Sequence, residues 1–368
     1  MFETGLWINF QTTLIFLIVL SILILVHEWG HFITAKLLGV EVREFALGFG
    51  PTLFSKTWHG TTYMVKLFPL GGYVRMLGDE RGKCTGNSKE FYSKAPGLRS
   101  LIVLNGPVVN FILAYVSFVF VFMLGYPDLA PTVGKVSDGY PAQTARLQEG
   151  DKIVEVNGQK IESWTDLQES IKSSKGQELK VSFLRDEQSM STMIQPKVEE
   201  RKNIFGQTQE TAVVGISPSE DFVSLTYDFG TSVVKAGEKL VEITFMTYKA
   251  IYFMITGSMS AKDNVTGPIG IFYIIKAATE LGFSNLLYVL GVISASLAIF
   301  NLLPIIPLDG GHLLLFGIEK IRGAMLSAKV EDYVARFGFT LIILLALFVF
   351  YSDFARFGWF DKLKNILP

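Results

Sequence analysis

Long apolar runs alternate with polar stretches along the chain. Four runs approach the ~20 residues that a helix needs to cross a bilayer; they cover residues 14–26 with their continuation towards Lys36, then 101–125, 286–303 and 337–351. Because the first run passes directly into polar residues and lacks a basic start, we read it as an uncleaved helix. The pattern therefore predicts a polytopic α-helical membrane protein with four transmembrane helices.

The polar stretch at residues 130–218 has a different pattern of short alternating strands and turns. It predicts one small extramembrane α+β domain. The remaining parts are a first membrane half, a helical amphipathic region and a second membrane half, at residues 1–129, 219–285 and 286–368.

Within this domain, Asn157-Gly158 marks a hairpin turn and residues 164–173 form an amphipathic helix. We further expect a short helix at 140–147, strands at 152–156, 179–184, 190–194 and 212–217, and an interfacial helix at 222–256. Between the first two spans, residues 45–54 and 62–76 are too apolar for a solvated linker. These predict a membrane-associated β-rich loop, since lipid-exposed sheet edges are not tolerated.

Composition narrows the function. The chain is 49% hydrophobic with a formal net charge of -1, which excludes an ordinary soluble enzyme and offers no basic field for nucleic acid. A single cysteine, Cys84, excludes an intrachain disulfide and a cysteine-rich zinc module, so any metal must be bound by His and carboxylates.

Basic residues also predict the orientation. No Lys or Arg precedes Lys36, whereas many lie between the first two spans and again between the last two. Those loops should be cytoplasmic. Both termini and residues 130–285 then lie outside the cytoplasm.

The first apolar run ends in the sequence His27-Glu28-Trp29-Gly30-His31, an HExxH motif. Residues four apart share one face of a helix, so both imidazoles can bind one Zn²⁺, with the glutamate beside the water that the metal activates. Ionisable groups inside a span cost roughly 2.5 kcal/mol or more each and mark function. The motif predicts a metal site with Glu28 as a general base.

A catalytic zinc needs a third protein ligand, and Asp309 is the strongest candidate. It follows Pro304 and Pro307, which break the third span and free backbone groups at membrane depth. His312 is an alternative ligand or a partner of Asp309. An ordinary turn or helix cap is the other interpretation of Asp309 followed by two glycines.

Two asparagines in the spans are further candidates. Asn110 follows Gly106-Pro107 and either forms an interhelical hydrogen bond or orients a metal ligand. Asn301 precedes the proline-broken segment and could contact a substrate backbone. His59 has no partner at ligand spacing and is interpreted as a loop residue.

Together, HEWGH in a first span, GPVVNF in a second, VTGPIGI, and NLLPIIPLDGGH in a third resemble the site-2 protease family of intramembrane zinc metalloproteases, and its bacterial RseP-like group most closely. The resemblance implies one zinc per chain, held by His27, His31 and Asp309, with Glu28 as the base. It also implies that Asn301, Pro304 and the glycines Gly71 and Gly72 lie along the substrate path.

The resemblance extends to residues 130–218, which look like a circularly permuted PDZ domain. Its peptide-binding edge would comprise Val213, Val214, Gly215 and Ile216. The best-known relatives carry two tandem PDZ domains, whereas this chain has room for one, so their scheme of substrate gating cannot be transferred intact.

The resemblance thus implies regulated intramembrane proteolysis in a bacterial inner membrane. Substrates would be single-pass proteins, such as anti-sigma factors or signal-peptide remnants, already trimmed by a site-1-type protease. A non-proteolytic scaffold or chaperone with structural zinc is the alternative, and a zinc transporter is a third; neither needs Glu28 beside the metal. Fe or Co could occupy the same ligands.

Overall fold

The computed structural model describes residues 2–80, 84–203, 205 and 207–358 of the chain. The chain folds into two compact units. The first, called the membrane unit here, comprises Met1–Phe120, Val233–Lys249 and Ser260–Pro368; the second, the β-rich unit, comprises Val121–Ser232 and Ala250–Met259.

The membrane unit is built mainly from helices, and within the described residues four of them are long and apolar enough to cross a membrane. The candidate spans are Phe10–Leu37, Pro96–Leu124, Phe283–Asn301 and Lys329–Arg356, as the apolar runs predict. The helices are α1 (Phe2–Leu37), α2 (Pro96–Leu124), α5 (Phe229–Ile255), α6 (Ala261–Asn264), α7 (Pro268–Glu280), α8 (Phe283–Asn301), α9 (Asp309–Arg322) and α10 (Ala328–Arg356).

Small residues let these helices approach closely. A Cβ added at Gly30 of α1 would lie 2.4 Å from the carbonyl oxygen of Asn105 on α2, and one at Gly291 of α8 would lie 2.7 Å from the Phe118 ring. Close backbone approach is the usual means of helix association where water cannot drive it. These glycines therefore fix which helices pack together.

A buried carboxylate joins α7 to α10. Asp353 of α10 is fully buried and accepts hydrogen bonds from the backbone amides of Gly267, Ile269 and Gly270 at the start of α7. These amides have no partner within their own helix, and a negative charge is favourable at this end. Asp353 therefore caps α7 from the neighbouring helix.

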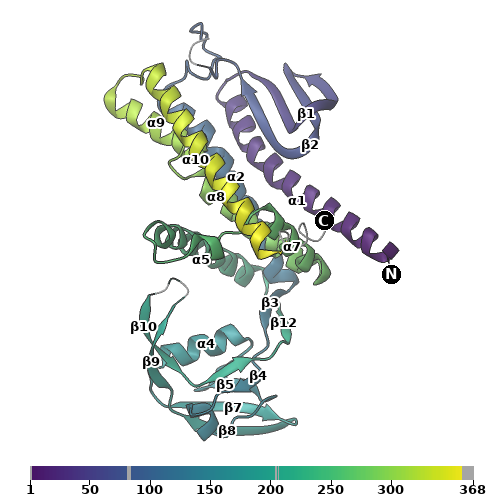
Figure 1. Ribbon diagram of the computed structural model, residues 1–368, viewed down its shortest axis with the longest axis vertical. Coiled ribbons are helices and arrows are strands. Elements are labelled where there is room, and N and C mark those ends of the chain that lie inside the picture. The colour runs from purple at the N-terminus through teal and green to yellow at the C-terminus, as the bar shows by residue number, and fades with distance from the viewer. Residues whose placement is uncertain (1, 81–83, 204, 206, 359–368) are drawn as a thin grey trace, which may run out of the picture. The chain divides into compact units, whose positions relative to one another are not determined.

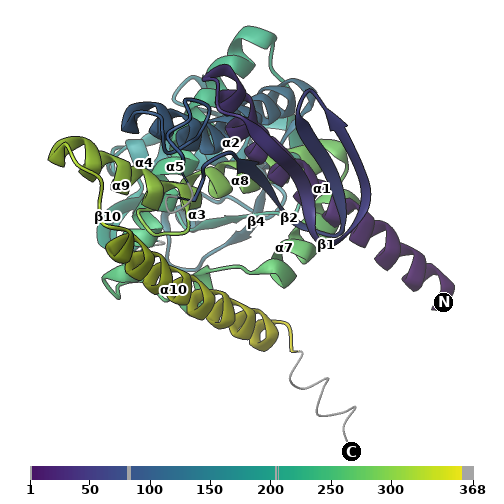
Figure 2. The same cartoon turned by 90° about the horizontal axis from the view of Figure 1, so that it is seen from above.

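The predicted β-rich loop forms β1 (Val42–Trp58) and β2 (Thr61–Met76), which lie alongside α1 (Figure 1, Figure 2). The chain turns inside β1 at Gly48 and Gly50, both of which have a positive φ. Residues 42–47 therefore pair on one side with 72–76 and on the other with 62–65, while 52–58 pair with 61–66. Residues 72–76 form one edge of this small sheet.

The β-rich unit contains ten short strands and two helices within the described residues. Its central sheet has the order β6-β5-β7-β8. The strands are β3 (Tyr126–Leu129), β4 (Val133–Val136), β5 (Lys152–Val156), β6 (Gln159–Lys160), β7 (Leu179–Arg185), β8 (Gln188–Ile194), β9 (Lys197–Lys202), β10 (Thr208–Val213), β11 (Ile216–Pro218) and β12 (Phe222–Leu225), and the helices are α3 (Pro141–Thr144) and α4 (Trp164–Ser173).

An apolar core holds this unit together. Helix α4 buries Trp164, Leu167 and Ile171, which are spaced along one face. A capping box between Ser163 and Asp166 fixes the start of α4. The helix packs against an inner face of strand residues with alternating burial, such as Leu179, Val181 and Phe183 of β7.

The structure corrects four boundaries expected from the sequence. The β-rich unit extends beyond 130–218 because β3 and β12 pair with each other. The expected strand at 212–217 is split into β10 and β11 at Gly215, whose φ is 83°.

The other two corrections concern helices. Residues 222–225 form β12 rather than the start of a helix, and α5 begins only after Asp228, whose side chain accepts from the Thr231 amide. The helix expected at 140–147 covers only Pro141–Thr144, because Arg146 adopts a positive φ of 59°.

Candidate metal centre and active site

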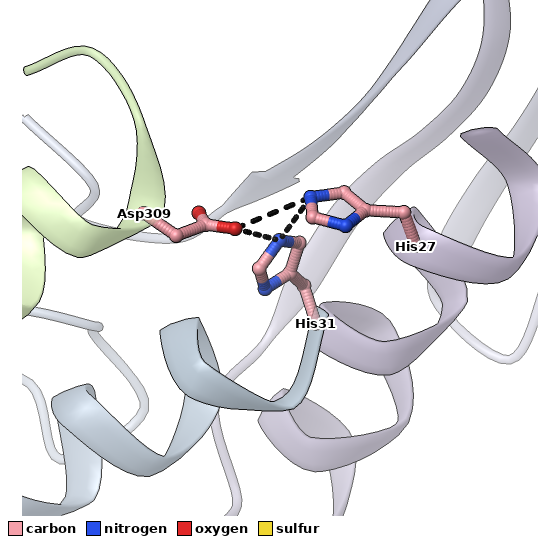
Figure 3. A group of neighbouring side chains, drawn as sticks. All are labelled: His27, His31 and Asp309. Atoms are coloured by element: carbon pink, nitrogen blue, oxygen red, sulfur yellow. Dashed lines mark hydrogen bonds and ion pairs between the residues drawn. The ribbon is translucent and has the colours of Figure 1, made fainter. Parts of the chain in front are cut away.

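Helix α1 places His27 and His31 one turn apart on the same face. Their Nε2 atoms lie 3.2 Å apart, and both side chains are mostly buried, at 12% and 11% exposure (Figure 3). Trp29, between them in sequence, is 48% exposed on the opposite side of the helix. The HExxH spacing therefore brings both imidazoles to one point, as the sequence predicts.

Asp309 reaches the same point from α9, of which it is the first residue. Between α8 and α9 the chain is irregular, as the prolines predict. A Cβ added at Gly310 would lie 2.2 Å from the Leu302 carbonyl oxygen, and one at Gly311 would lie 2.5 Å from the Ile306 nitrogen. Only glycines let α9 start this close to the preceding loop, which sets the place of the carboxylate.

The three donor atoms have the spacing of a metal site. The Oδ2 atom of Asp309 lies 3.2 Å from Nε2 of His27 and 3.5 Å from Nε2 of His31 (Figure 3). Four ligands arranged tetrahedrally about zinc, with bonds of about 2.0–2.1 Å, are separated from one another by about 3.4 Å. Oδ2 is also buried without a hydrogen bond of good geometry among the described residues. The donor set therefore fits a zinc ion.

Helix α2 contacts both imidazoles at their Nδ1 atoms. Nδ1 of His31 lies 3.0 Å from the Ile102 carbonyl oxygen, to which it donates its proton, leaving the Nε2 lone pair for the metal. The Asn110 amide lies 3.3 Å from Nδ1 of His27. The structure places the amide nitrogen Nδ2 towards the ring and leaves Oδ1 of Asn110 buried without a hydrogen-bond partner among the described residues.

The same helix makes room for the rings. A Cβ added at Gly106 would lie 2.4 Å from both Cε1 and Nε2 of His31. Beside it, Asn105 donates to the Gly30 carbonyl oxygen at 3.2 Å and to the Thr34 hydroxyl at 2.5 Å. Glycine and asparagine together thus hold α1 against α2 at the level of the HExxH motif.

A cavity of about 270 Å³ opens beside the cluster. Polar groups of its wall come from Glu28, His31, Asp309 and His312, and from Asp79 in the chain after β2. The rest of the wall is mostly apolar and comprises Val74, Met76, Phe91, Tyr92, Val103 and Phe316. The cavity offers space for a peptide segment beside a metal and a carboxylate.

The other residues singled out from the sequence are placed as follows. The sheet edge approaches the motif at Gly72, where an added Cβ would lie 3.1 Å from Cγ of Glu28; Gly71 beside it has a φ of 139°. Asn301 is the last residue of α8, and Pro304 is exposed in the irregular segment. His59 lies in the turn between β1 and β2.

Residues 213–216 do not form one continuous strand edge. The carbonyl oxygens of Val214 and Gly215 accept from the amides of Ala142 and Ser137, and Ile216 pairs with Val136 of β4. Their role as a peptide-binding edge remains a prediction.

Sequence reasoning missed the roles of Ile102 and Asn105. The Ile102 contribution is a backbone carbonyl, which no side-chain pattern reveals. The position of Asn105 directly before Gly106 was a usable signal, because both face the motif-bearing helix.

Comparison with known proteins identifies the family to which the chain belongs. Residues 15–345 match the model of peptidase family M50. The chain therefore belongs to peptidase family M50, the site-2 protease family, and it is a zinc metalloprotease with the multiple apolar helices of a membrane protein.

Several curated relatives are similar over almost their whole length. A Clostridium acetobutylicum protein is 34% identical over 348 residues, covering 94% of this chain and 98% of its own. The zinc metalloprotease RasP of Oceanobacillus iheyensis is 28% identical, covering 94% and 99%. The protease RseP of Yersinia pestis is 29% identical, covering 93% and 98%.

Among solved structures, the PDZ domain of an SdrC-like protein from Listeria monocytogenes matches 24% of this chain and 87% of its own, with 24% identity and a TM-score of 0.20. A score this low carries no argument about the fold of the β-rich unit.

Proposed function

We propose that this metalloprotease hydrolyses peptide bonds within or near the transmembrane helices of single-pass membrane proteins whose outer domains have already been trimmed. One observation carries the proposal: Nε2 of His27, Nε2 of His31 and Oδ2 of Asp309 converge within metal-binding distance, beside Glu28 and a cavity, inside a group of apolar helices. A structural zinc site would need neither the cavity nor Glu28.

Glu28 is the general base of the proposed reaction. When bound, zinc supplies Lewis acidity, which polarises the scissile carbonyl and lowers the pKa of the attacking water. The Glu28 carboxylate accepts a proton from that water as its oxygen attacks the carbonyl carbon, and then delivers the proton to the leaving amide nitrogen. His27, His31 and Asp309 would hold the metal, while the Ile102 carbonyl oxygen keeps His31 in the required tautomer and the Asn110 amide contacts Nδ1 of His27.

The proposed substrate must be unwound before it is cut. A helix buries its peptide carbonyls in intrahelical hydrogen bonds, so a scissile bond becomes accessible only in an extended segment. The edge at residues 72–76 borders the cavity through Val74 and Met76. We propose that it holds the unwound segment by strand addition, with Gly71 and Gly72 allowing close approach and Asn301 and Pro304 further along the path.

The orientation proposed from the basic residues places the active site towards the cytoplasmic half of a bacterial inner membrane. Both termini and the β-rich unit then lie outside the cytoplasm. We propose that this unit acts as a PDZ-like domain, which excludes or tethers ectodomains not yet trimmed by an upstream site-1-type protease.

The function is tested by cleavage of a truncated single-span substrate in liposomes, with bound zinc quantified for the same samples. Glu28→Gln should abolish cleavage and retain zinc, because it removes the base and none of the ligands. Glu238→Gln on α5, outside the cavity, is the matched control and should cut normally. If Glu28→Gln cuts at the wild-type rate, or if the wild type holds zinc and cuts none of a broad panel of helices, the proposal is wrong.

A further inference from the structure

A buried ion pair joins α2 to α9 outside the metal cluster. Nη2 of Arg99 lies 2.5 Å from Oε1 of Glu319, although the residues are 220 positions apart. The Arg99 side chain is 0% exposed and that of Glu319 is 5% exposed. Removing two charges from water is costly, and such pairs often stabilise less than apolar replacements would. Stability alone is therefore a weak reason for this pair.

Several contacts fix the Arg99 guanidinium in one place. Its Nε donates to the Lys94 carbonyl oxygen at 3.0 Å. Its central carbon lies 4.7 Å from the ring centre of Phe316 and 5.2 Å from that of Tyr92. Phe316, also on α9, is 1% exposed. Arg99 therefore contacts α9 through a charge and an aromatic ring at once, which restricts both rotation and sliding of that helix.

The same turn of α2 also contacts the first ligand helix. Ile102 follows Arg99 by three residues, and its carbonyl oxygen accepts the proton of His31 Nδ1 at 3.0 Å. One turn of α2 is thus attached to α1 through Ile102 and to α9 through Arg99. The distance between the two ligand-bearing helices depends on this turn.

On α9 the attachment lies on the face that carries the metal ligand. Asp309, His312, Phe316 and Glu319 follow one another at intervals of three and four residues, which places them on one side of the helix. Glu319 lies about 15 Å along the axis from Asp309, at 1.5 Å per residue. Since a helix moves as a rigid rod over this length, a rotation at Glu319 turns Asp309 as well.

We propose that Arg99 and Glu319 are positioning residues of the metal centre. Their pair sets the rotation and axial position of α9, and thereby holds the Asp309 carboxylate at bonding distance from the ion that His27 and His31 bind. The inference rests on the assignment of Asp309 as a ligand in the proposed function.

The test separates positioning from stability by replacing both charges together. Arg99→Met with Glu319→Leu removes the pair without leaving one charge buried alone, so the full-length protein in detergent should unfold at a temperature near that of the wild type. Zinc affinity, measured by chelator competition, should fall about 10–100-fold, as for other groups that orient ligands. The visible spectrum of the cobalt-substituted protein should change as well.

Two single variants extend the test in case the double variant fails to fold. Glu319→Asp keeps the charge but shortens the side chain by one methylene, and Arg99→Lys keeps the charge but loses the planar fork. Each should weaken zinc binding and alter the cobalt spectrum. Asp353→Asn is the matched control: it disturbs an equally buried carboxylate that caps α7, and it should lower the unfolding temperature without changing zinc affinity.

The inference is overturned if folded variants of the pair bind zinc as tightly as the wild type and give the same cobalt spectrum. It is also overturned if Asp353→Asn reduces zinc affinity as much as they do, since any loss of stability would then suffice. Asp309→Ala, measured alongside, keeps the two hypotheses distinct. If that variant retains full zinc affinity, the ligand assignment fails irrespective of Arg99 and Glu319.

Discussion

The two units of this chain differ in where their polar and apolar residues lie. In the β-rich unit an apolar core of residues such as Leu167 and Phe183 lies inside. In the membrane unit, large apolar side chains such as Phe120 and Leu344 are exposed, whereas Asn110, Arg99 and Asp353 are buried. The difference follows from the solvent: lipid does not drive apolar groups inward, so close packing and polar contacts determine the membrane unit.

This comparison also explains where the chemistry lies. A metal centre needs several polar groups aimed at one point, and the buried polar groups of the membrane unit provide the proposed ligands His31 and Asp309. Mutations should accordingly affect the two units in different ways. The membrane unit should lose metal and activity through steric or polar changes, and the β-rich unit should lose stability through cavities.

The largest effect is expected from Gly106→Ala. The new Cβ would meet the His31 ring at 2.4 Å, so the ring or α2 must shift and the metal site should be lost. Bound zinc and substrate cleavage, measured on detergent-purified protein, should both fall below detection. Gly97→Ala, at the start of the same helix with open space around it, should retain both. Equal zinc content in the two variants would contradict the assigned geometry.

The next effect concerns the β-rich unit alone. Leu167→Ala removes a side chain that is 1% exposed from the core, which should destabilise this unit by about 2–5 kcal/mol through lost burial and a cavity. Limited proteolysis within residues 121–232 should become faster, while zinc stays bound. Met190→Ala on the exposed side of β8 is the control and should change little. Loss of zinc in Leu167→Ala would show that zinc binding in the membrane unit depends on the stability of the β-rich unit.

A smaller effect is expected from Asn110→Ala. Without the amide, Nδ1 of His27 loses the polar group that lies 3.3 Å away and restrains the ring, so zinc affinity should fall about 10–100-fold. Chelator competition measures this directly. Asn285→Ala, near the exposed start of α8, should leave the affinity unchanged. A wild-type affinity for Asn110→Ala would mean that the asparagine serves helix packing alone.

The smallest effect is a local dependence on pH. Glu90 accepts from the backbone amides of Thr85 and Gly86 and from two hydroxyls, and these hydrogen bonds hold its pKa at about 2, below the usual value near 4.5. Because the pKa of Glu90 is lower in the folded than in the unfolded state, its hydrogen bonds contribute fully to stability above a pH of about 4.5. This contribution disappears as the pH falls from about 4.5 towards 2.

Hydrogen exchange at the Thr85 and Gly86 amides should therefore accelerate, relative to the intrinsic rate, over that range. Glu90→Gln should show faster exchange at all pH values and lose the dependence, whereas Glu149→Gln should behave as the wild type. Exchange that is independent of pH in the wild type would contradict the role of the carboxylate.

The sequence predicted the spans and the convergence of His27, His31 and Asp309 because both leave local signatures. The four apolar runs coincide with the candidate spans, and helical spacing alone brings His27 and His31 together. Pro304, Pro307 and the glycines after Asp309 indicated the break in the helix that lets Asp309 lie beside His27 and His31. The helix Trp164–Ser173 followed from its apolar spacing and its start at Ser163.

What the sequence could not predict depends on contacts between distant segments. The Ile102 carbonyl and the Arg99–Glu319 pair become visible only when α2 is placed against α1 and α9. The wider bounds of the β-rich unit depend on pairing between β3 and β12, which are almost a hundred residues apart. The split of residues 212–217 arises from a positive φ at Gly215, for which a run of apolar residues gives no sign.

In the proposed function His27, His31 and Asp309 bind the catalytic zinc, and X-ray absorption at the zinc edge detects these ligands. We expect a four-coordinate ion with nitrogen and oxygen ligands at about 2.0–2.1 Å and the multiple-scattering pattern of two imidazoles. The X-ray absorption spectrum of the Asp309→Ala variant should show the loss of the carboxylate oxygen ligand. The ligand assignment would be wrong if the spectrum showed a sulfur ligand at about 2.3 Å, which only cysteine or methionine could supply. It would also be wrong if fewer than two imidazoles were bound.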